Sequence, residues 1–142
     1  MICVDASLAA KWVLSEFDSH AALELYRQTR SRGETIIAPQ LMPSEVANAI
    51  WRWRVRRMID LAECLQRQAA FLNFEIQVSA PDGLQERAFA LAEAFERPTI
   101  YDMYYVALAE FAGCELWTAD TRLVNAIGGR LPFVRALATY TG

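Results

Sequence analysis

The apolar and polar positions along the chain predict strands separated by helices. Short apolar runs with β-branched residues indicate buried strands at MICVD (1–5), TIIA (35–38), EIQVS (75–79) and ELWTA (115–119), with room for a small fifth strand in LPFVRAL (131–137). Helical periodicity occupies the segments between them, at residues 7–14, 18–32, 44–57, 60–72, 84–95, 99–112 and 120–127. Parallel neighbours need such crossovers, so the pattern predicts an α/β fold: a central, mostly parallel sheet of four to five strands with helices on both faces.

Glycine and proline mark several of the predicted boundaries. Gly33 is well suited to end the helix before TIIA, and Pro39 is expected to end the TIIA strand itself. The run Pro81–Gly83 predicts a turn. Gly128 and Gly129 are expected to close the last helix.

Two of the predicted strands stop on an aspartate, at Asp5 and at Asp120. In open α/β sheets, ligands bind outside the carboxyl ends of the strands, where the following helices also begin. Two further acids, Glu45 and Asp102, fall at predicted helix starts. We therefore expect all four carboxylates to face one cleft.

Each acid also has a purely structural explanation. Asp5 and Asp120 precede helices and can act as N-caps. Asp102 follows Thr99 with capping-box spacing, and Glu45 complements the dipole of the helix that it begins. The set is therefore more informative than any one member.

Four clustered carboxylates require a cation. Two carboxylates about 4 Å apart repel by roughly 4 kcal/mol at an effective dielectric constant of about 20. In the sequence no lysine is near these acids and no arginine adjoins them, although Arg122 could fold back. Oxygen ligands without His or Cys suit Mg²⁺ or Mn²⁺. His20, the only histidine, is expected at the surface, which disfavours a zinc site or a catalytic triad.

Composition narrows the class of protein. With 142 residues, 54% of them hydrophobic, the chain (1–142) is expected to form a single domain. We expect a cytoplasmic protein, because no apolar run is long enough to span a bilayer and the N-terminus lacks signal-peptide features. The cysteines, which are expected to be reduced core residues, are Cys3, Cys64 and Cys114. Lys11 is the only lysine, which excludes a phosphate-binding loop ending in GK[ST].

Four ordered segments carry a family resemblance: MICVDAS, PSEVANAI, IYDMYYVALAE and WTADTRL. Their order and spacing resemble the PIN-domain family, in particular the compact toxin ribonucleases of VapBC-type toxin–antitoxin pairs. One departure is Met103, where the family usually has a small residue. The resemblance implies a PIN-like fold and an acidic quartet formed by Asp5, Glu45, Asp102 and Asp120.

The resemblance also implies a reaction, a metal-dependent endoribonuclease activity that uses Mg²⁺ or Mn²⁺. Asp5 and Asp102 would be the primary metal ligands, and Asp120 would hold a second ion or a metal-bound water. Glu45 would be either a ligand or the group that orients the attacking water. Hydrogen-bonding residues implied to support these carboxylates are Ser7 and Thr118, with Asn48 facing the cleft.

The basic residues suggest where RNA could bind. Without the four site acids the net charge changes from −3 to +1, so the acidity belongs largely to the site. Arg52, Arg54 and Arg56 lie on the helix that begins at Glu45 and form a candidate RNA track. The alternatives are a solvated arginine face with Trp51 in the core, or arginines that meet an acidic partner.

The resemblance further implies protein partners: a homodimer, neutralised in a hetero-oligomer by a cognate antitoxin whose C-terminal segment blocks the active site. No membrane association is expected. Two other functions stay open at this stage. One is a DNA nuclease or phosphatase with the same carboxylate–metal chemistry, and the other is a binding module without catalytic activity.

Overall fold

One parallel sheet forms the centre of the computed structural model, which describes residues 1–127 and 129–142. Within these residues the strands are β1 (Ile2–Val4), β2 (Ile36–Pro39), β3 (Gln77–Ser79), β4 (Glu115–Thr118) and β5 (Val134–Ala136), in the order β3-β2-β1-β4-β5. Each neighbouring pair is parallel, for example Cys3 opposite Leu116. The predicted α/β class and parallel sheet are confirmed, including the small last strand.

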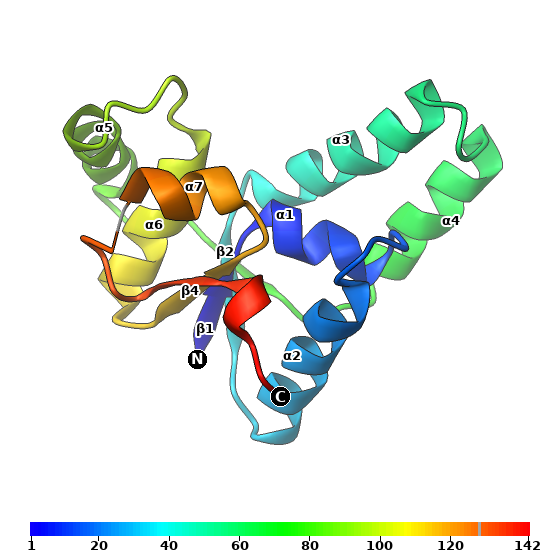
Figure 1. Cartoon of the computed structure of the whole chain (residues 1–142), viewed down its shortest axis with the longest axis horizontal. Coiled ribbons are helices and arrows are strands. Elements are labelled where there is room, and N and C mark those ends of the chain that lie inside the picture. The colour runs from blue at the N-terminus through cyan, green and yellow to red at the C-terminus, as the bar shows by residue number, and fades with distance from the viewer. Residues whose placement is uncertain (128) are drawn as a thin grey trace.

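Helices connect the strands and cover both faces of the sheet. They are α1 (Ala6–Ala9), the 3₁₀ turn η1 (Ala10–Trp12), α2 (Ser19–Ser31), α3 (Met42–Val55), α4 (Leu61–Phe71), α5 (Leu84–Ala94), α6 (Tyr101–Ala112), α7 (Thr121–Ile127) and the 3₁₀ turn η2 (Leu137–Thr139). Figure 1 shows α1 to α4 on one side of the strands and α5 to α7 on the other. The α3–α4 hairpin projects from the body as an arm.

The strand order explains why the helices separate into these two groups. From β1 the chain moves outward to β2 and β3, and it then returns to β4 and moves outward in the opposite direction to β5. Right-handed crossovers in opposite directions place their helices on opposite faces of a sheet. The order therefore reverses between β1 and β4, and such a reversal is where open α/β sheets form a ligand crevice at the carboxyl ends of their strands.

The central strands are buried because they are covered on both faces. Cys3 and Val4 in β1 and Leu116 in β4 are fully buried, whereas the edge strand β3 is largely exposed. Met103, the residue that departs from the family pattern, is also fully buried. All three cysteines are free; Cys3 and Cys64 are buried as expected, whereas Cys114 is only partly buried.

Two helices begin earlier in the chain than predicted. The helix expected at residues 7–14 is a short α1 followed by η1, and it begins at Ala6, where the carboxylate of Asp5 caps it. The helix expected from residue 44 begins at Met42, with Pro43 in its first turn. Proline is tolerated there because the first N–H groups of a helix have no partner within the helix.

Two other boundary predictions are wrong. One of them concerns only the bounds of the strand: β2 does end at Pro39 as expected, but Pro39 is its last residue and Thr35 lies outside it. The pairing with β1 has already ended at Pro39, so its missing N–H costs no hydrogen bond to β1. The capping box between Thr99 and Asp102 does not form, because α6 begins at Tyr101 and its cap residue, Ile100, has no side-chain hydrogen bond.

The glycine predictions are confirmed in part. Gly33 has a positive φ of 70° directly after the C-cap of α2, a conformation that favours glycine. The prediction that Gly128 helps to close α7 lies outside the described residues. None of the helices in residues 1–127 and 129–142 combines the length and apolar composition that crossing a bilayer requires.

Candidate active site

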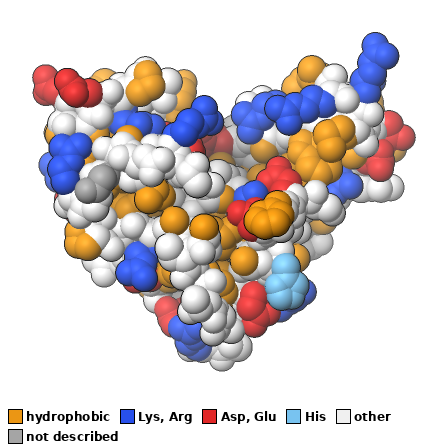
Figure 2. All heavy atoms as spheres, in the orientation of Figure 1, with side chains coloured by type: hydrophobic (Ala, Val, Ile, Leu, Met, Phe, Trp, Pro, Cys, Tyr) orange, Lys and Arg blue, Asp and Glu red, His pale blue; other side chains and the backbone are white. Residues whose placement is uncertain are grey.

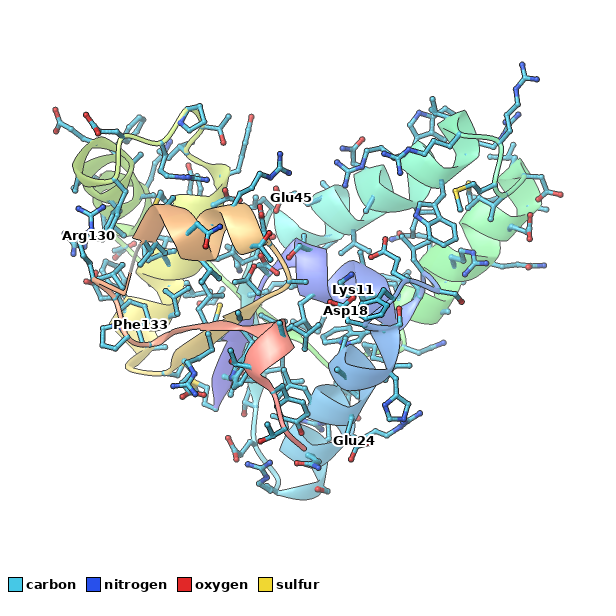
Figure 3. All side chains as sticks on the ribbon, viewed as in Figure 1. Lys11, Asp18, Glu24, Glu45, Arg130 and Phe133 are labelled. Carbon is cyan, nitrogen blue, oxygen red and sulfur yellow. The ribbon has the colours of Figure 1, made fainter. Side chains whose placement is uncertain are left out.

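The four predicted acids line one cavity of about 730 Å³. Asp5 follows β1 and Asp120 follows β4, so both lie at the carboxyl ends of the two central strands. Glu45 comes from the first turn of α3 on one face of the sheet, and Asp102 from the first turn of α6 on the other. The cavity therefore lies between the two groups of helices, where Figure 3 labels Glu45.

Asp5 is the most buried of these carboxylates, with 5% of its surface exposed. Its Oδ1 accepts hydrogen bonds from the Ser7 hydroxyl at 2.7 Å and the Leu8 N–H at 3.0 Å, and its Oδ2 accepts one from the Thr118 hydroxyl. Burial, together with a smaller contribution from the charge of Asp102, raises the pKa of Asp5 to about 6 despite these hydrogen bonds. Asp5 is thus both a helix cap and a cavity residue.

Two hydroxyls join the loops that follow β1 and β4. Ser7 Oγ accepts a hydrogen bond from the Ala119 N–H at 3.0 Å, and Thr118 Oγ1 accepts one from the Asp120 N–H at 2.9 Å. Because both hydroxyls also donate to Asp5, the positions of Asp5 and Asp120 are coupled through them. Ser7 and Thr118 are the two hydroxyl residues that the sequence analysis expected to support these carboxylates, and both donate to Asp5.

Glu45 has a partner that the sequence analysis did not identify. The hydroxyl of Tyr105 donates a hydrogen bond to Glu45 Oε2, which links α6 to α3. Burial raises the pKa of Glu45, the charge of Asp102 also raises it, and the Tyr105 hydrogen bond and Arg52 oppose the shift. Tyr105 lies one helical turn after Asp102, and that spacing places both residues on one side of α6.

Basic side chains compensate part of the negative charge. Arg97 Nη2 lies 3.2 Å from Asp102 Oδ2, and Arg122 Nε lies 3.7 Å from Asp120 Oδ1. Lys11 also lines the cavity, so the expectation that no lysine is near is wrong. The Lys11 ammonium is paired with Glu16 and with Asp18, which Figure 3 labels beside it.

The donor set fits a hard divalent cation. The lining offers carboxylate oxygens and contains neither His nor Cys, which suits Mg²⁺ or Mn²⁺. The carboxylates also influence one another, because the charge of Asp102 acts on both Asp5 and Glu45. His20 is exposed and is not part of this lining. In the conformations of residues 1–127 and 129–142, no three His, Cys, Asp or Glu side chains are arranged to hold a metal ion. The residues thus fit a divalent cation by the chemistry of their oxygen atoms and by their position around one cavity.

The three arginines expected to contact RNA do not share one surface. Arg52 lines the cavity together with Asn48, one turn earlier on α3, and Arg56 is exposed one turn later. Arg54 lines a second cavity of about 520 Å³ at the α3–α4 turn. Trp51 is 52% exposed, so the alternative that placed it in the core is wrong.

Several residues in or beside the cavity were not identified from the sequence. They are Tyr105, the lining residues Lys11, Glu16 and Tyr101, and Arg97, which pairs with Asp102. Of these, Tyr105 could have been found from its i, i+3 spacing to Asp102 on a predicted helix. Lys11, in η1, and Arg97, in the loop after α5, gave no comparable signal.

Comparisons with known proteins identify the family of this chain. The family model of the PIN domain matches residues 2–128. Ribonuclease VapC12 from Mycobacterium tuberculosis is 35% identical over 128 residues, which cover 90% of this chain and 93% of the relative. The VapC ribonuclease Mb0985 from Mycobacterium bovis is 29% identical over 132 residues, covering 93% and 95%.

Solved structures show the same fold. PAE2754 from Pyrobaculum aerophilum superimposes with a TM-score of 0.69 at 21% identity, covering 97% of this chain and 84% of that one. VapC20 from Mycobacterium tuberculosis, titled a Sarcin-Ricin loop cleaving toxin, gives a TM-score of 0.64 at 18% identity, covering 89% and 95%. The chain therefore belongs to the PIN domain family, as a VapC-like member.

Proposed function

We propose that this protein is a Mg²⁺- or Mn²⁺-dependent endoribonuclease that acts as the toxin of a toxin–antitoxin pair. The observation that carries the proposal is the convergence of four acids from four separate segments on one cavity, at the reversal of strand order. Membership of the PIN domain family and similarity to proteins named VapC ribonucleases support the reaction class.

Asp5, Asp102 and Asp120 would hold the metal. When bound there, the ion would lower the pKa of a coordinated water and neutralise charge that develops on the scissile phosphate. Ser7 and Thr118 keep the Asp5 carboxylate fixed through donated hydrogen bonds, which preserves its orientation before substrate arrives. Glu45 serves as a ligand or orients the attacking water, and its raised pKa makes it a better proton acceptor.

Basic side chains offer contacts to the RNA backbone. Arg52 on α3 and Arg122 on α7 line the cavity from the two groups of helices. Figure 2 shows basic side chains on both sides of the hollow that separates the α3–α4 arm from the rest of the molecule. Arginine pairs with phosphate through a planar fork and stacks on bases. We propose that RNA crosses the cavity between Arg52 and Arg122, with Arg56, the C-cap residue of α3, extending the contact.

The arm supports the proposal of a protein partner. Large apolar side chains are exposed on and between α3 and α4, and we call them the arm surface: Trp51, Val55, Met58, Leu61 and Leu65. Exposed apolar patches of this kind mark interaction sites. We propose that a cognate antitoxin covers the arm surface and inserts a basic residue into the acidic cavity, in a cytoplasmic complex that contains a toxin homodimer.

Side-by-side digestion of labelled RNA and DNA tests the reaction. The proposal expects cleavage of RNA within the strand and little cleavage of DNA. Preferred cleavage of DNA, or release of phosphate from a small phosphomonoester, would instead favour the DNA nuclease or phosphatase. A protein that neither binds Mn²⁺ in a titration nor cleaves either polymer would be a binding module.

A further inference from the structure

Tyr105 is a core residue with one polar atom directed at the candidate active site. It lies on α6 one turn after Asp102, and 2% of its surface is exposed. Its hydroxyl donates a hydrogen bond to Glu45 Oε2, and the residue contributes to the cavity lining. Glu45 belongs to α3, in the other group of helices. The hydrogen bond therefore joins the two sides of the cavity.

Glu45 would not stay in this position without a donor. Its carboxylate is partly buried, and the negative charge of Asp102 disfavours it. A glutamate side chain also loses considerable rotamer freedom when it is fixed. Burial without a hydrogen bond is costly for a charged group, so an unpaired Glu45 would turn toward solvent. The Tyr105 hydroxyl supplies the compensating hydrogen bond, and the charge of Arg52 adds a smaller favourable contribution.

We propose that Tyr105 is a positioning residue that holds Glu45 inside the cavity and directs its second oxygen toward the reacting groups. Within the described residues, Oε2 is occupied by Tyr105 while Oε1 accepts no hydrogen bond, which leaves Oε1 available to a water or an ion. Tyr105 thus acts through Glu45 and does not touch the substrate. This inference rests on the proposed ribonuclease function.

The kinetic test is a double-mutant cycle. Tyr105→Phe removes the hydroxyl and keeps the buried ring, and Glu45→Gln removes the charge that the hydroxyl holds. Loss of such a supporting partner typically costs about 10- to 100-fold in activity, so we expect a fall of that size in kcat for Tyr105→Phe with KM unchanged. The double variant should be no slower than Glu45→Gln alone. Independent effects that multiply would overturn the inference.

A matched control separates this role from general damage to α6. Tyr104, the adjacent residue, is partly buried, and its hydroxyl makes no hydrogen bond within the described residues. Tyr104→Phe should keep the wild-type kcat, and both phenylalanine variants should melt within a few degrees of each other. Equal loss of kcat in the two variants would contradict a specific role for Tyr105.

A crystal structure of Tyr105→Phe gives a readout that does not depend on activity. The Glu45 carboxylate should leave the cavity and become solvent exposed. An unmoved Glu45 would overturn the inference even if the variant were slow. Conversely, if the wild-type protein fails to cleave RNA, the proposed function fails, while the position of Glu45 still decides whether Tyr105 holds it.

Discussion

The hydroxyl of Thr118 donates a hydrogen bond to Asp5, across 113 residues of sequence. Thr118 is the last residue of β4 and is fully buried, and Asp5 directly follows β1. The contact therefore joins the ends of the two central strands, where the order of the sheet reverses. It also fixes the most buried carboxylate of the candidate active site.

Thr118→Val should weaken both stability and activity. A hydrogen bond to a charged group contributes about 1.5–3 kcal/mol, so the free energy of unfolding near neutral pH should fall by about that amount. RNA cleavage should fall by about 10- to 100-fold, because Asp5 loses one of its supports. Chemical denaturation and a single-turnover cleavage assay measure the two effects.

Thr29 provides the matched control for this substitution. It is also a buried threonine, but its hydroxyl donates to the backbone carbonyl of Leu25 within α2, away from the cavity. Thr29→Val should cost about 0.5–1.5 kcal/mol and leave cleavage unchanged. If both valine variants lose the same activity, the Thr118 hydroxyl has no special role.

Asp5→Asn should stabilise the metal-free protein above about pH 6. The pKa of Asp5 is about 6 in the folded protein and 3.8 ordinarily, so the folded state keeps this proton to higher pH than the unfolded state does. The free energy of unfolding should therefore fall as the pH rises from about 4 to about 6, by up to about 3 kcal/mol, and then stay low.

The asparagine variant lacks this titration. In EDTA, the melting temperature of Asp5→Asn should exceed that of the wild type at about pH 7.5, and the two melting temperatures should become similar at about pH 4. Asp82→Asn, which changes an exposed turn residue outside the cavity, serves as the control substitution. A constant difference between Asp5→Asn and wild type across this range would contradict the raised pKa.

Arginines inside and outside the cavity should affect RNA binding differently. Arg52→Ala and Arg122→Ala should each weaken binding to single-stranded RNA and reduce the slope of log K against log salt by about 0.7 per lost phosphate contact. Arg54→Ala serves as the control, since Arg54 lines a different cavity. Fluorescence anisotropy in an Asp102→Asn background, which should prevent cleavage, gives these slopes. Equal slopes for the Arg52 and Arg54 variants would exclude the proposed path.

The arm surface should matter for the partner and not for the chemistry. Trp51→Ala removes a large exposed aromatic side chain and should weaken binding to the protein encoded beside this one by more than about tenfold, with RNA cleavage unchanged. Phe89→Ala, on α5 on the other side of the sheet, is the control for the loss of an exposed aromatic side chain. Isothermal titration calorimetry measures both affinities. A normal affinity for Trp51→Ala would place the antitoxin elsewhere.

The sequence carried enough information for the fold because periodicity and strand alternation are local signals. Asp5 and Asp120 could be placed together because both follow strands, and the carboxyl ends of parallel strands lie at one edge. Helix starts were less accurate at Met42 and Tyr101, where the cap residues Leu41 and Ile100 make no side-chain hydrogen bond and so leave no sequence signature.

The supporting interactions of the site were harder to predict. The Arg97–Asp102 pair depends on the conformation of the loop after α5, where Glu96 has a φ of 49°. The separation of Arg97 and Asp102 in the sequence does not reveal that conformation. The Tyr105–Glu45 hydrogen bond joins helices on opposite faces of the sheet, which requires the packed structure. Spacing predicts which residues share a helix face, and packing decides what that face meets.

The most direct test of the account is RNA cleavage by wild type and by Asp102→Asn, each with Mg²⁺, with Mn²⁺ and with EDTA. Asp102 lines the cavity and acts electrostatically on Asp5 and Glu45, and the asparagine keeps its size while removing its charge. The account predicts cleavage by the wild type only with a divalent ion, and none by Asp102→Asn in any condition, with Asp82→Asn fully active. Undiminished cleavage in EDTA, or normal cleavage by Asp102→Asn, would contradict it.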